Sequence, residues 1–149
     1  MPGPLHFSRR NLPHFRLDGA SYFITWRLHP TQKELSETER DGVVAILRRF
    51  EGHRYRLHGY VVMNDHVHVM VEAVEPWRLH QILHSWKSFS AYTLQRRYGR
   101  LGSVWQDESF DRVIRDEAEY AEKRTYILNN PAKRWPNMAG YPWVWAVGE

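Results

Sequence analysis

The chain has 149 residues, of which 42% are hydrophobic and 26% are charged, and these values are typical of one soluble globular domain. Lys and Arg outnumber Asp and Glu by 21 to 17, which gives a net charge of +4 and suggests a polyanionic partner without identifying it. The absence of cysteine excludes disulfides, thiolate metal sites and cysteine nucleophiles. Because neither a long apolar run nor a signal-peptide core is visible, we expect a cytoplasmic protein that does not enter a membrane.

Four segments have the composition of β-strands. Residues 21–28 (SYFITWRL) alternate and are rich in β-branched and aromatic side chains. Residues 54–63 and 66–74 flank Asn64-Asp65, a pair that predicts a tight hairpin turn. A further short strand is predicted at residues 110–115, and the segment after residue 130 has no clear pattern.

Three segments have helical periodicity. Residues 36–50 open with Ser36 and Glu39 in capping-box spacing, residues 76–98 form an amphipathic pattern, and residues 116–130 are followed by Pro131. The order β-α-β-β-α-β and a last helix predicts an α+β fold of the ferredoxin-like (RRM-like) type. In that fold an antiparallel sheet carries helices on one face, here with an additional C-terminal helix.

His66 and His68 form the first chemically distinctive pair. Residues i and i+2 of a strand project from the same face, so both imidazoles project together, away from the side of Val67. Two neighbouring imidazoles suit a divalent metal ion, and the alternative is a pair of half-exposed strand histidines without a ligand. A histidine-triad nucleotide hydrolase is excluded because the third alternating position is Met70.

The predicted C-terminal helix offers a third ligand. Tyr126 and Asn130 are four residues apart and share one helical face. An asparagine carbonyl oxygen is able to bind a metal ion, and a tyrosine hydroxyl is able to attack phosphorus. Two alternatives stay open: Tyr126 as a core residue with Asn130 as a helix C-cap, and Asn129 as the ligand instead of Asn130.

Several short stretches together resemble one family. The chain resembles the REP-associated tyrosine transposases, relatives of the small single-tyrosine HUH transposases of insertion sequences. The similarity covers nearly the whole chain, and the matching stretches are RRNLPH at 9–14, YFIT at 22–25, VMNDHVH at 62–68, HSWKSF at 84–89, GSVWQ at 102–106, FDR at 110–112, RDE at 115–117, YI at 126–127 and NNP at 129–131.

The resemblance implies one HUH transposase-like domain over residues 1–149, acting in the bacterial cytoplasm at the nucleoid. It implies metal-dependent cleavage of single-stranded DNA and strand transfer at repetitive extragenic palindromes, which form hairpins. It places His66 and His68 on the HUH metal-binding motif, Asn130 as the third metal ligand, and Tyr126 as the nucleophile of a catalytic C-terminal helix. A 5′-phosphotyrosine ester conserves the bond energy for rejoining, so no nucleotide cofactor is expected.

The ligand chemistry and the family resemblance predict different metal ions. Two imidazoles by themselves favour zinc, nickel or copper. The family implies Mg²⁺ or Mn²⁺, which keep open, water-filled positions around a phosphate, and we expect one of these two ions because the reaction needs an open site. The resemblance also favours a monomer acting in cis, with a dimer as the alternative.

Two basic segments are candidates for DNA binding, and neither residues 76–106 nor residues 1–17 contain an acidic residue. Residues 76–106 offer cations for phosphates and aromatic rings for unpaired bases, and residues 1–19 form a basic arm expected to read bases beside a hairpin. The alternatives are core tryptophans, a solvated helix end and a disordered tail. The candidate residues are Trp86, Lys87, Arg96, Arg97, Arg100 and Trp105 in the first segment, and Arg9, Arg10 and His14 in the arm.

A different class of function is compatible with the same residues. A domesticated, non-catalytic module would keep the fold and bind single-stranded or hairpin DNA without cleaving it. The intact set His66, His68, Tyr126 and Asn130 favours the enzyme. A covalent protein–DNA adduct is the observation that separates the two.

Overall fold

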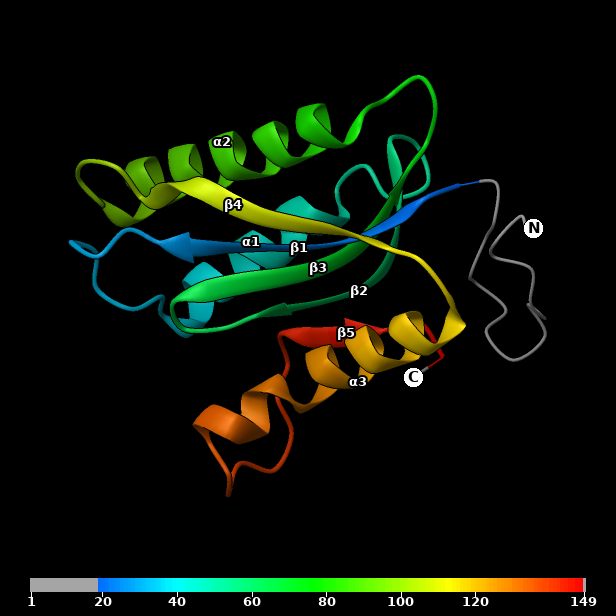
Figure 1. The fold of residues 1–149 in the computed structure, drawn as a ribbon. Helices are drawn as coiled ribbons and strands as arrows, with labels where there is room; N and C mark the ends of the chain where they lie inside the picture. Colours follow the sequence, from blue (N-terminus) through cyan, green and yellow to red (C-terminus); the bar gives the residue numbers. More distant parts are fainter. Residues whose placement is uncertain (1–18, 149) are drawn as a thin grey trace.

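The computed structural model describes residues 19–148 (Figure 1). The elements, in chain order, are β1 (Ser21–Leu28), α1 (Glu37–Arg48), β2 (Tyr55–Val62), β3 (His66–Ala73), α2 (Leu79–Tyr98), β4 (Trp105–Ile114), α3 (Glu117–Arg134) and β5 (Val144–Ala146). The capping box predicted at the first helix is present, because the Ser36 hydroxyl accepts from the Glu39 backbone and the Glu39 carboxylate accepts from the Ser36 backbone.

The strands form one antiparallel sheet in the order β4-β1-β3-β2-β5. The first four strands have the ferredoxin-like arrangement, so the predicted α+β class is confirmed. The β2–β3 hairpin turns at Asn64 and Asp65 as predicted, with the Met63 N–H donating to the His66 carbonyl at 2.8 Å. In the register between β1 and β3, Thr25 pairs with His68 and Arg27 pairs with His66.

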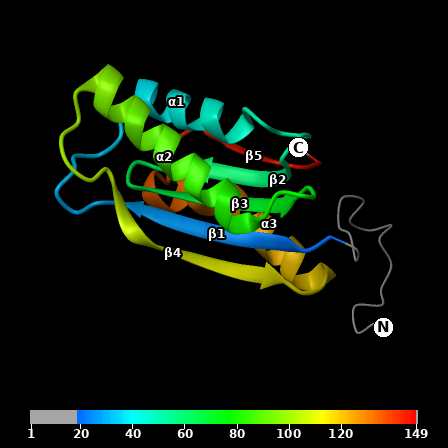
Figure 2. The ribbon, with the colours of Figure 1, turned by 90° about the horizontal axis from the view of Figure 1, so that it is seen from above.

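The helices occupy both faces of the sheet (Figures 1 and 2). Helices α1 and α2 pack on one face over a core that includes Val67, Val69 and Val71 of β3. Helix α3 lies on the opposite face, where Met70 belongs to a second, smaller core with Ile127. Side chains alternate between the faces of a strand, so His66 and His68 project toward α3.

Helix α3 is longer than predicted. Pro131 does not end it at Asn130; the helix continues to Arg134, and the Trp135 N–H donates to the Pro131 carbonyl at 2.8 Å. A proline removes one i→i−4 hydrogen bond, a cost that burial of its ring in the folded protein offsets. This extra turn decides which cations reach the site described below.

Two other boundaries differ from the prediction, and one further strand is present. Helix α2 starts at Leu79 rather than Pro76, since the Gln81 side chain accepts from the Arg78 N–H and caps the helix there. Strand β4 starts at Trp105 rather than Phe110, because pairing with β1 holds its charged residues in an edge strand. Strand β5 was not predicted, and its three residues are too few to show alternation.

Candidate functional site

The two histidines of β3 lie side by side. Their ring centroids are 4.7 Å apart and the ring planes are nearly perpendicular, at 75°. His68 is buried, whereas His66 is half-buried at the end of the strand. The i, i+2 spacing therefore brings the two imidazoles together on the α3 face, as the sequence predicts.

Each imidazole is held through its Nδ1 atom. Nδ1 of His66 lies 2.7 Å from the carboxylate of Asp65, and Nδ1 of His68 lies 2.7 Å from the hydroxyl of Thr25. Within residues 19–148, the buried Nε2 atom of His68 has no hydrogen-bond partner. A ring with its proton on Nδ1 keeps a lone pair on Nε2, and this tautomer is the one that binds a metal ion.

Burial also fixes the charge of His68. Its pKa is lowered from 6.5 to about 3, first by burial and then by electrostatic interactions with His66, Arg27, Lys133 and Lys123. The ring is consequently neutral throughout the physiological pH range. A neutral imidazole is the form that a metal ion requires.

Helix α3 places Tyr126 against these histidines. The Tyr126 ring meets His68 edge-on, with centroids 5.2 Å apart, and Phe23 edge-on at 5.9 Å. Its exposed fraction is 38%, so the side chain is open to solvent on one side. The core alternative for this tyrosine is therefore not supported. The structure brings a residue of α3 and a residue of β3 together within one chain.

The other tyrosine of α3, Tyr120, has the opposite environment. Tyr120 is buried and its hydroxyl lies 2.6 Å from Nδ1 of His58. Burial raises the pKa of Tyr120 well above its usual range. Of the two, only Tyr126 presents its ring at the histidine pair.

Asn130 completes the group at one open cleft. The cleft has a volume of about 430 Å³, and its lining residues include His66, Tyr126 and Asn130. Asn130 is buried while Asn129 is exposed. The structure thus places Asn130, and not Asn129, beside the candidate nucleophile.

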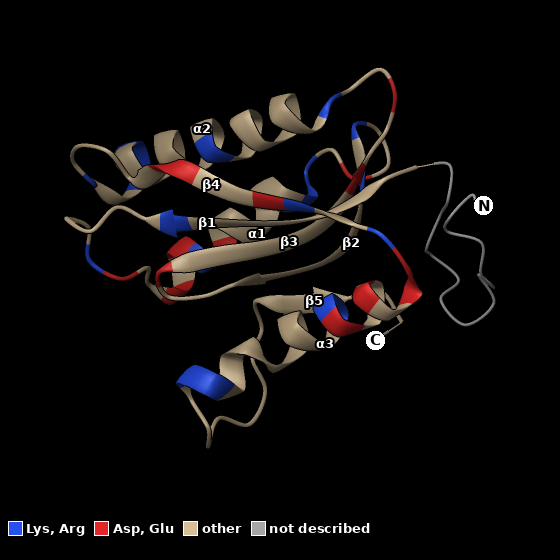
Figure 3. Ribbon diagram, in the orientation of Figure 1, with Lys and Arg blue, Asp and Glu red and all other residues tan. Residues whose placement is uncertain are grey.

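The cleft is also lined by cations that the sequence analysis did not select. They are Arg27 of β1 and Lys133 and Arg134 of the last turn of α3, with Glu34 and Asp65 as acidic neighbours. Lys133 Nζ lies 4.1 Å above the centre of the Tyr126 ring. Figure 3 shows this basic end of α3 in blue. Arg27 reaches the cleft because it pairs with His66 across β1 and β3, a register that the sequence does not show. Lys133 follows Tyr126 by seven residues, which places both on one helical face, but a helix predicted to end at Asn130 does not include it.

The side chains at this cleft determine which metal ion could bind there. The described residues contain no group of three or more His, Cys, Asp or Glu side chains able to hold a metal ion. Two imidazoles are present, so a metal ion here needs a ligand of another type, and Asn130 lines the same cleft as His66. With the unpartnered Nε2 of His68, these residues fit a divalent ion with open positions.

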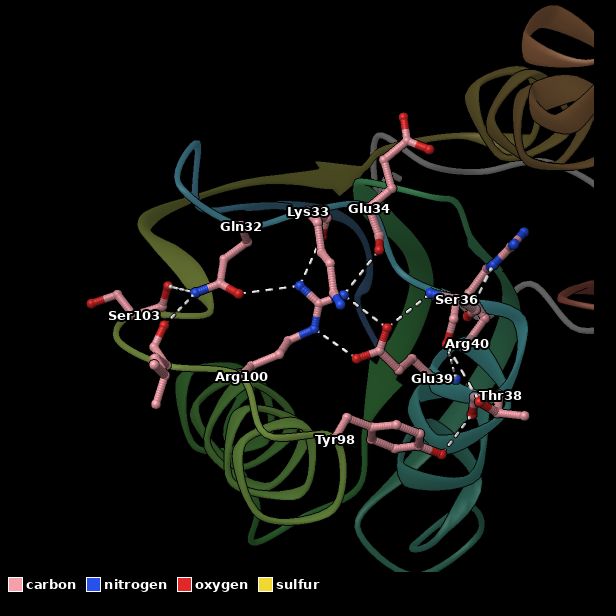
Figure 4. A network of polar contacts seen from close by, with 11 residues as sticks. Gln32, Lys33, Glu34, Ser36, Thr38, Glu39, Arg40, Tyr98, Arg100 and Ser103 are labelled. Atoms are coloured by element: carbon pink, nitrogen blue, oxygen red, sulfur yellow. Dashed lines mark hydrogen bonds and ion pairs between the residues drawn. The ribbon is translucent and has the colours of Figure 1, made fainter.

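Arg100 is not the surface cation that the sequence suggests. It is buried, and its guanidinium donates to both carboxylate oxygens of Glu39, at 2.6 and 2.7 Å (Figure 4). It also donates to Gln32 Oε1 and to the carbonyl oxygens of Lys33 and Glu34. Arg100 therefore joins the end of α2 to α1, and its donors are used within the protein.

The two tryptophans are also structural. Trp86 is 2% exposed and stacks on Trp26 in the core, and Trp105 is 5% exposed and donates to the Ser90 hydroxyl at 2.8 Å. Neither ring is available to stack on a base. The amphipathic pattern that made Trp86 a candidate reflects its packing between α2 and the sheet.

Lys87 is engaged within the fold as well. Its ammonium donates to the carbonyl oxygens of Gln106 and Asp107 and to the hydroxyl of Ser109, which ties α2 to β4. Burial lowers the pKa of Lys87. Its role in phosphate binding, expected from the sequence, is replaced by this structural one.

Arg96 and Arg97 are exposed at the end of α2, across the sheet from Tyr126. Arg96 lies over the Tyr92 ring at 5.5 Å. The acid-free segment is thus divided between core and surface. The candidates Arg9, Arg10 and His14 lie outside the described residues.

Comparison with known proteins identifies the family. The family model "Transposase IS200 like" matches residues 19–130. The chain belongs to the IS200-like transposases. The match includes β1, the histidine pair of β3 and α3 as far as Asn130. A comparison with curated proteins found no match.

Two solved structures share the fold of this transposase-family chain. One is a REP-associated tyrosine transposase bound to a REP hairpin, with a TM-score of 0.66, 19% identity, and coverage of 93% of this chain and 81% of that chain. The other is a protein from Deinococcus radiodurans R1 named as a transposase, with a TM-score of 0.58, 21% identity, and coverage of 78% and 93%. No helix among residues 19–148 is long and apolar enough to span a membrane.

Proposed function

We propose that this chain is a metal-dependent single-stranded DNA endonuclease and strand transferase that forms a 5′-phosphotyrosine intermediate at REP-type hairpin DNA. The observation that carries the proposal is the placement of Tyr126, half exposed, against the His66–His68 pair in a cleft lined by cations. Membership of the transposase family supplies the class of reaction.

In the proposed cleavage step, the Tyr126 hydroxyl oxygen attacks the scissile phosphorus. A phosphorus–oxygen bond to Tyr126 forms, the bond to the 3′-oxygen breaks, the phenol proton passes to solvent, and the 3′-oxygen takes up a proton. In strand transfer, another 3′-hydroxyl attacks the same phosphorus and releases the tyrosine. One phosphodiester replaces another in each step, so the reaction needs no nucleotide cofactor.

The residues around Tyr126 have separate tasks in this scheme. A Mg²⁺ or Mn²⁺ ion held by His66, His68 and Asn130 would polarise the scissile phosphate and favour in-line attack. Asp65 and Thr25 orient the two imidazoles through their Nδ1 atoms. Arg27 and Lys133 attract the DNA backbone into the cleft.

Hairpin DNA is proposed as the substrate because a REP-hairpin complex is known for a protein of the same fold. Cleavage by a monomer in cis is proposed because, within one chain, Tyr126 contacts His68 and His68 contacts His66. The proposed location is the bacterial cytoplasm, at the nucleoid.

The test is a covalent adduct with a single-stranded hairpin oligonucleotide in the presence of Mn²⁺. Wild-type protein is expected to give an adduct on a denaturing gel, and mass spectrometry after nuclease trimming should place the nucleotide on Tyr126. Tyr126→Phe should give no adduct while binding DNA normally. Tyr92→Phe, which changes an exposed tyrosine of α2, is the matched control and should keep the adduct.

The second candidate function is a non-catalytic DNA-binding module. It is favoured only if wild-type protein binds hairpin DNA with normal affinity and gives no adduct with either metal ion. A nucleotide found on another residue, or an adduct that persists in Tyr126→Phe, would overturn the assignment of the nucleophile.

A further inference from the structure

A second open cleft adjoins the candidate site through Arg27. It also has a volume of about 430 Å³ and lies over β1 and β4, and we call it the β1–β4 cleft. Arg27 lines this cleft, the cleft of Tyr126 and a third one between them of about 350 Å³. The side chains that line the β1–β4 cleft include Thr25, Arg27, Gln106, Glu108 and Phe110.

Phe110 is the exposed aromatic residue of this cleft, at 58%, whereas Trp26, which also lines it, is buried. It pairs with Thr25 across β1 and β4, and Thr25 pairs with His68 across β1 and β3. Paired residues of neighbouring strands share a face, so Phe110 lies on the same face of the sheet as the histidines. The main contacts of helix α3 are with β2, β3 and β5, which leaves this ring open.

We infer that the β1–β4 cleft binds an unpaired base of the DNA strand beside the scissile phosphate, stacked on Phe110, with Arg27 contacting the intervening backbone. The inference rests on the proposed function and adds to it a nucleotide-binding position outside the reacting group. Strand spacing of about 4.8 Å places Phe110 about 10 Å from His68 across the sheet, within reach of a neighbouring nucleotide.

The chemistry of the cleft favours a nucleotide over an apolar protein segment. A single exposed aromatic ring beside a cation provides the stacking surface and the phosphate contact that single-stranded DNA uses. The volume lies within the range of small-ligand sites. Glu108 is the acidic residue among the described residues that line the cleft, and its carboxylate is able to accept from base amino groups.

The test is an abasic walk on a DNA hairpin with short single-stranded thymidine tails, measured as equilibrium binding in EDTA so that cleavage does not occur. For wild-type protein, an abasic site at one tail position should weaken binding about tenfold, as expected for loss of one stacked base. Phe110→Ala should weaken binding of the intact hairpin by a similar factor. In that variant, the same abasic site should have no further effect.

The controls separate stacking from folding. Val113→Ala removes another exposed apolar side chain of β4 and should leave both affinities unchanged. Phe110→Tyr keeps an aromatic ring and should restore the abasic effect, and thermal unfolding of each variant checks the fold. An abasic effect equal in wild type and Phe110→Ala at every position overturns the inference.

The outcomes also distinguish this inference from the proposed function. If wild-type protein forms the Tyr126 adduct but shows no coupling between Phe110 and an abasic site, only the base-binding position is wrong. If wild-type protein does not bind single-stranded or hairpin DNA, both are wrong.

Discussion

The hydroxyl of Thr25 lies 2.7 Å from Nδ1 of His68, a contact between neighbouring strands that leaves Nε2 of His68 unpartnered among the described residues. The exposed Thr31 makes a similar contact with Nδ1 of His29, at 2.8 Å. The first contact is partly buried beside the candidate metal site, and the second is exposed. The pair offers a matched test of whether the threonine orients a metal ligand.

We expect Thr25→Val to weaken Mn²⁺ binding by about 10- to 100-fold, because the proton of His68 is no longer held on Nδ1. A stability loss of about 1–3 kcal/mol should accompany it, since a buried ring nitrogen loses its partner. Calorimetric titration with Mn²⁺ and chemical unfolding measure the two effects. Thr31→Val should change neither, and equal Mn²⁺ affinity in the two variants would show that Thr25 does not orient a ligand.

Acid stability should depend on Glu39. Burial by itself raises the pKa of Glu39, but hydrogen bonds from Arg100 and Ser36 and the charge of Arg100 outweigh it and hold the pKa below the usual value of 4.5. A carboxylate with a lowered folded-state pKa stabilises the fold above the unfolded pKa and loses this contribution as the pH falls through the folded one. The free energy of unfolding should therefore decrease below about pH 4.5.

Glu39→Gln should lower the free energy of unfolding at neutral pH by about 3 kcal/mol, because Arg100 stays buried without its counter-charge. The difference from wild type should narrow as the pH falls below 4.5. Urea unfolding over a series of pH values measures this difference. Glu37→Gln, at an exposed site in the same first turn of α1, is the control and should unfold like wild type. If the difference in unfolding free energy between Glu39→Gln and wild type did not change with pH, the ion pair of Glu39 with Arg100 would not be the source of the acid dependence.

The exposed arginines at the end of α2 test a DNA contact on the face opposite Tyr126. We expect the double variant Arg96→Ala, Arg97→Ala to weaken hairpin binding and to flatten its dependence on salt, because each phosphate contact releases counterions. Binding titrations over a range of salt concentrations measure the slope. If the double variant had the same salt dependence as wild type, Arg96 and Arg97 would not contact the DNA and would only be solvated residues at the end of α2.

The C-terminal aromatic segment is fastened to α1 by Arg40. Its guanidinium carbon lies 4.3 Å from the centre of the Trp143 ring, and Nη1 donates to the Tyr141 hydroxyl at 3.0 Å. The Tyr141 hydroxyl in turn donates to the Val62 carbonyl at 2.7 Å. Arg40 is partly buried, so we expect Arg40→Met to lower the free energy of unfolding by about 1–2 kcal/mol, between the values for exposed and desolvated cation–π contacts.

Chemical unfolding of Arg40→Met measures this contribution, with Arg49→Met as the control. Arg49 lies over the rings of Phe50 and Phe89 but is exposed, so its loss should cost well under 1 kcal/mol. Equal destabilisation of the two variants would show that the contacts of Arg40 stabilise the fold no more than the exposed contacts of Arg49 do.

Local patterns in the sequence determined much of this molecule. Alternation and capping predicted β1 and α1, and the i, i+2 and i, i+4 spacings put His66 with His68 and Tyr126 with Asn130. These relationships depend only on the geometry of a strand or a helix, so they are readable without knowing the fold. The order of elements then predicted the ferredoxin-like sheet.

Only the tertiary structure decided which polar and aromatic residues are surface groups. Arg100 and Trp86 look like DNA contacts in an acid-free segment, yet Arg100 pairs with Glu39 of α1 and Trp86 packs on Trp26 of β1. Lys133 reaches Tyr126 because α3 continues through Pro131. Burial and pairing are set by partners distant in sequence, and a local pattern contains no information about those partners.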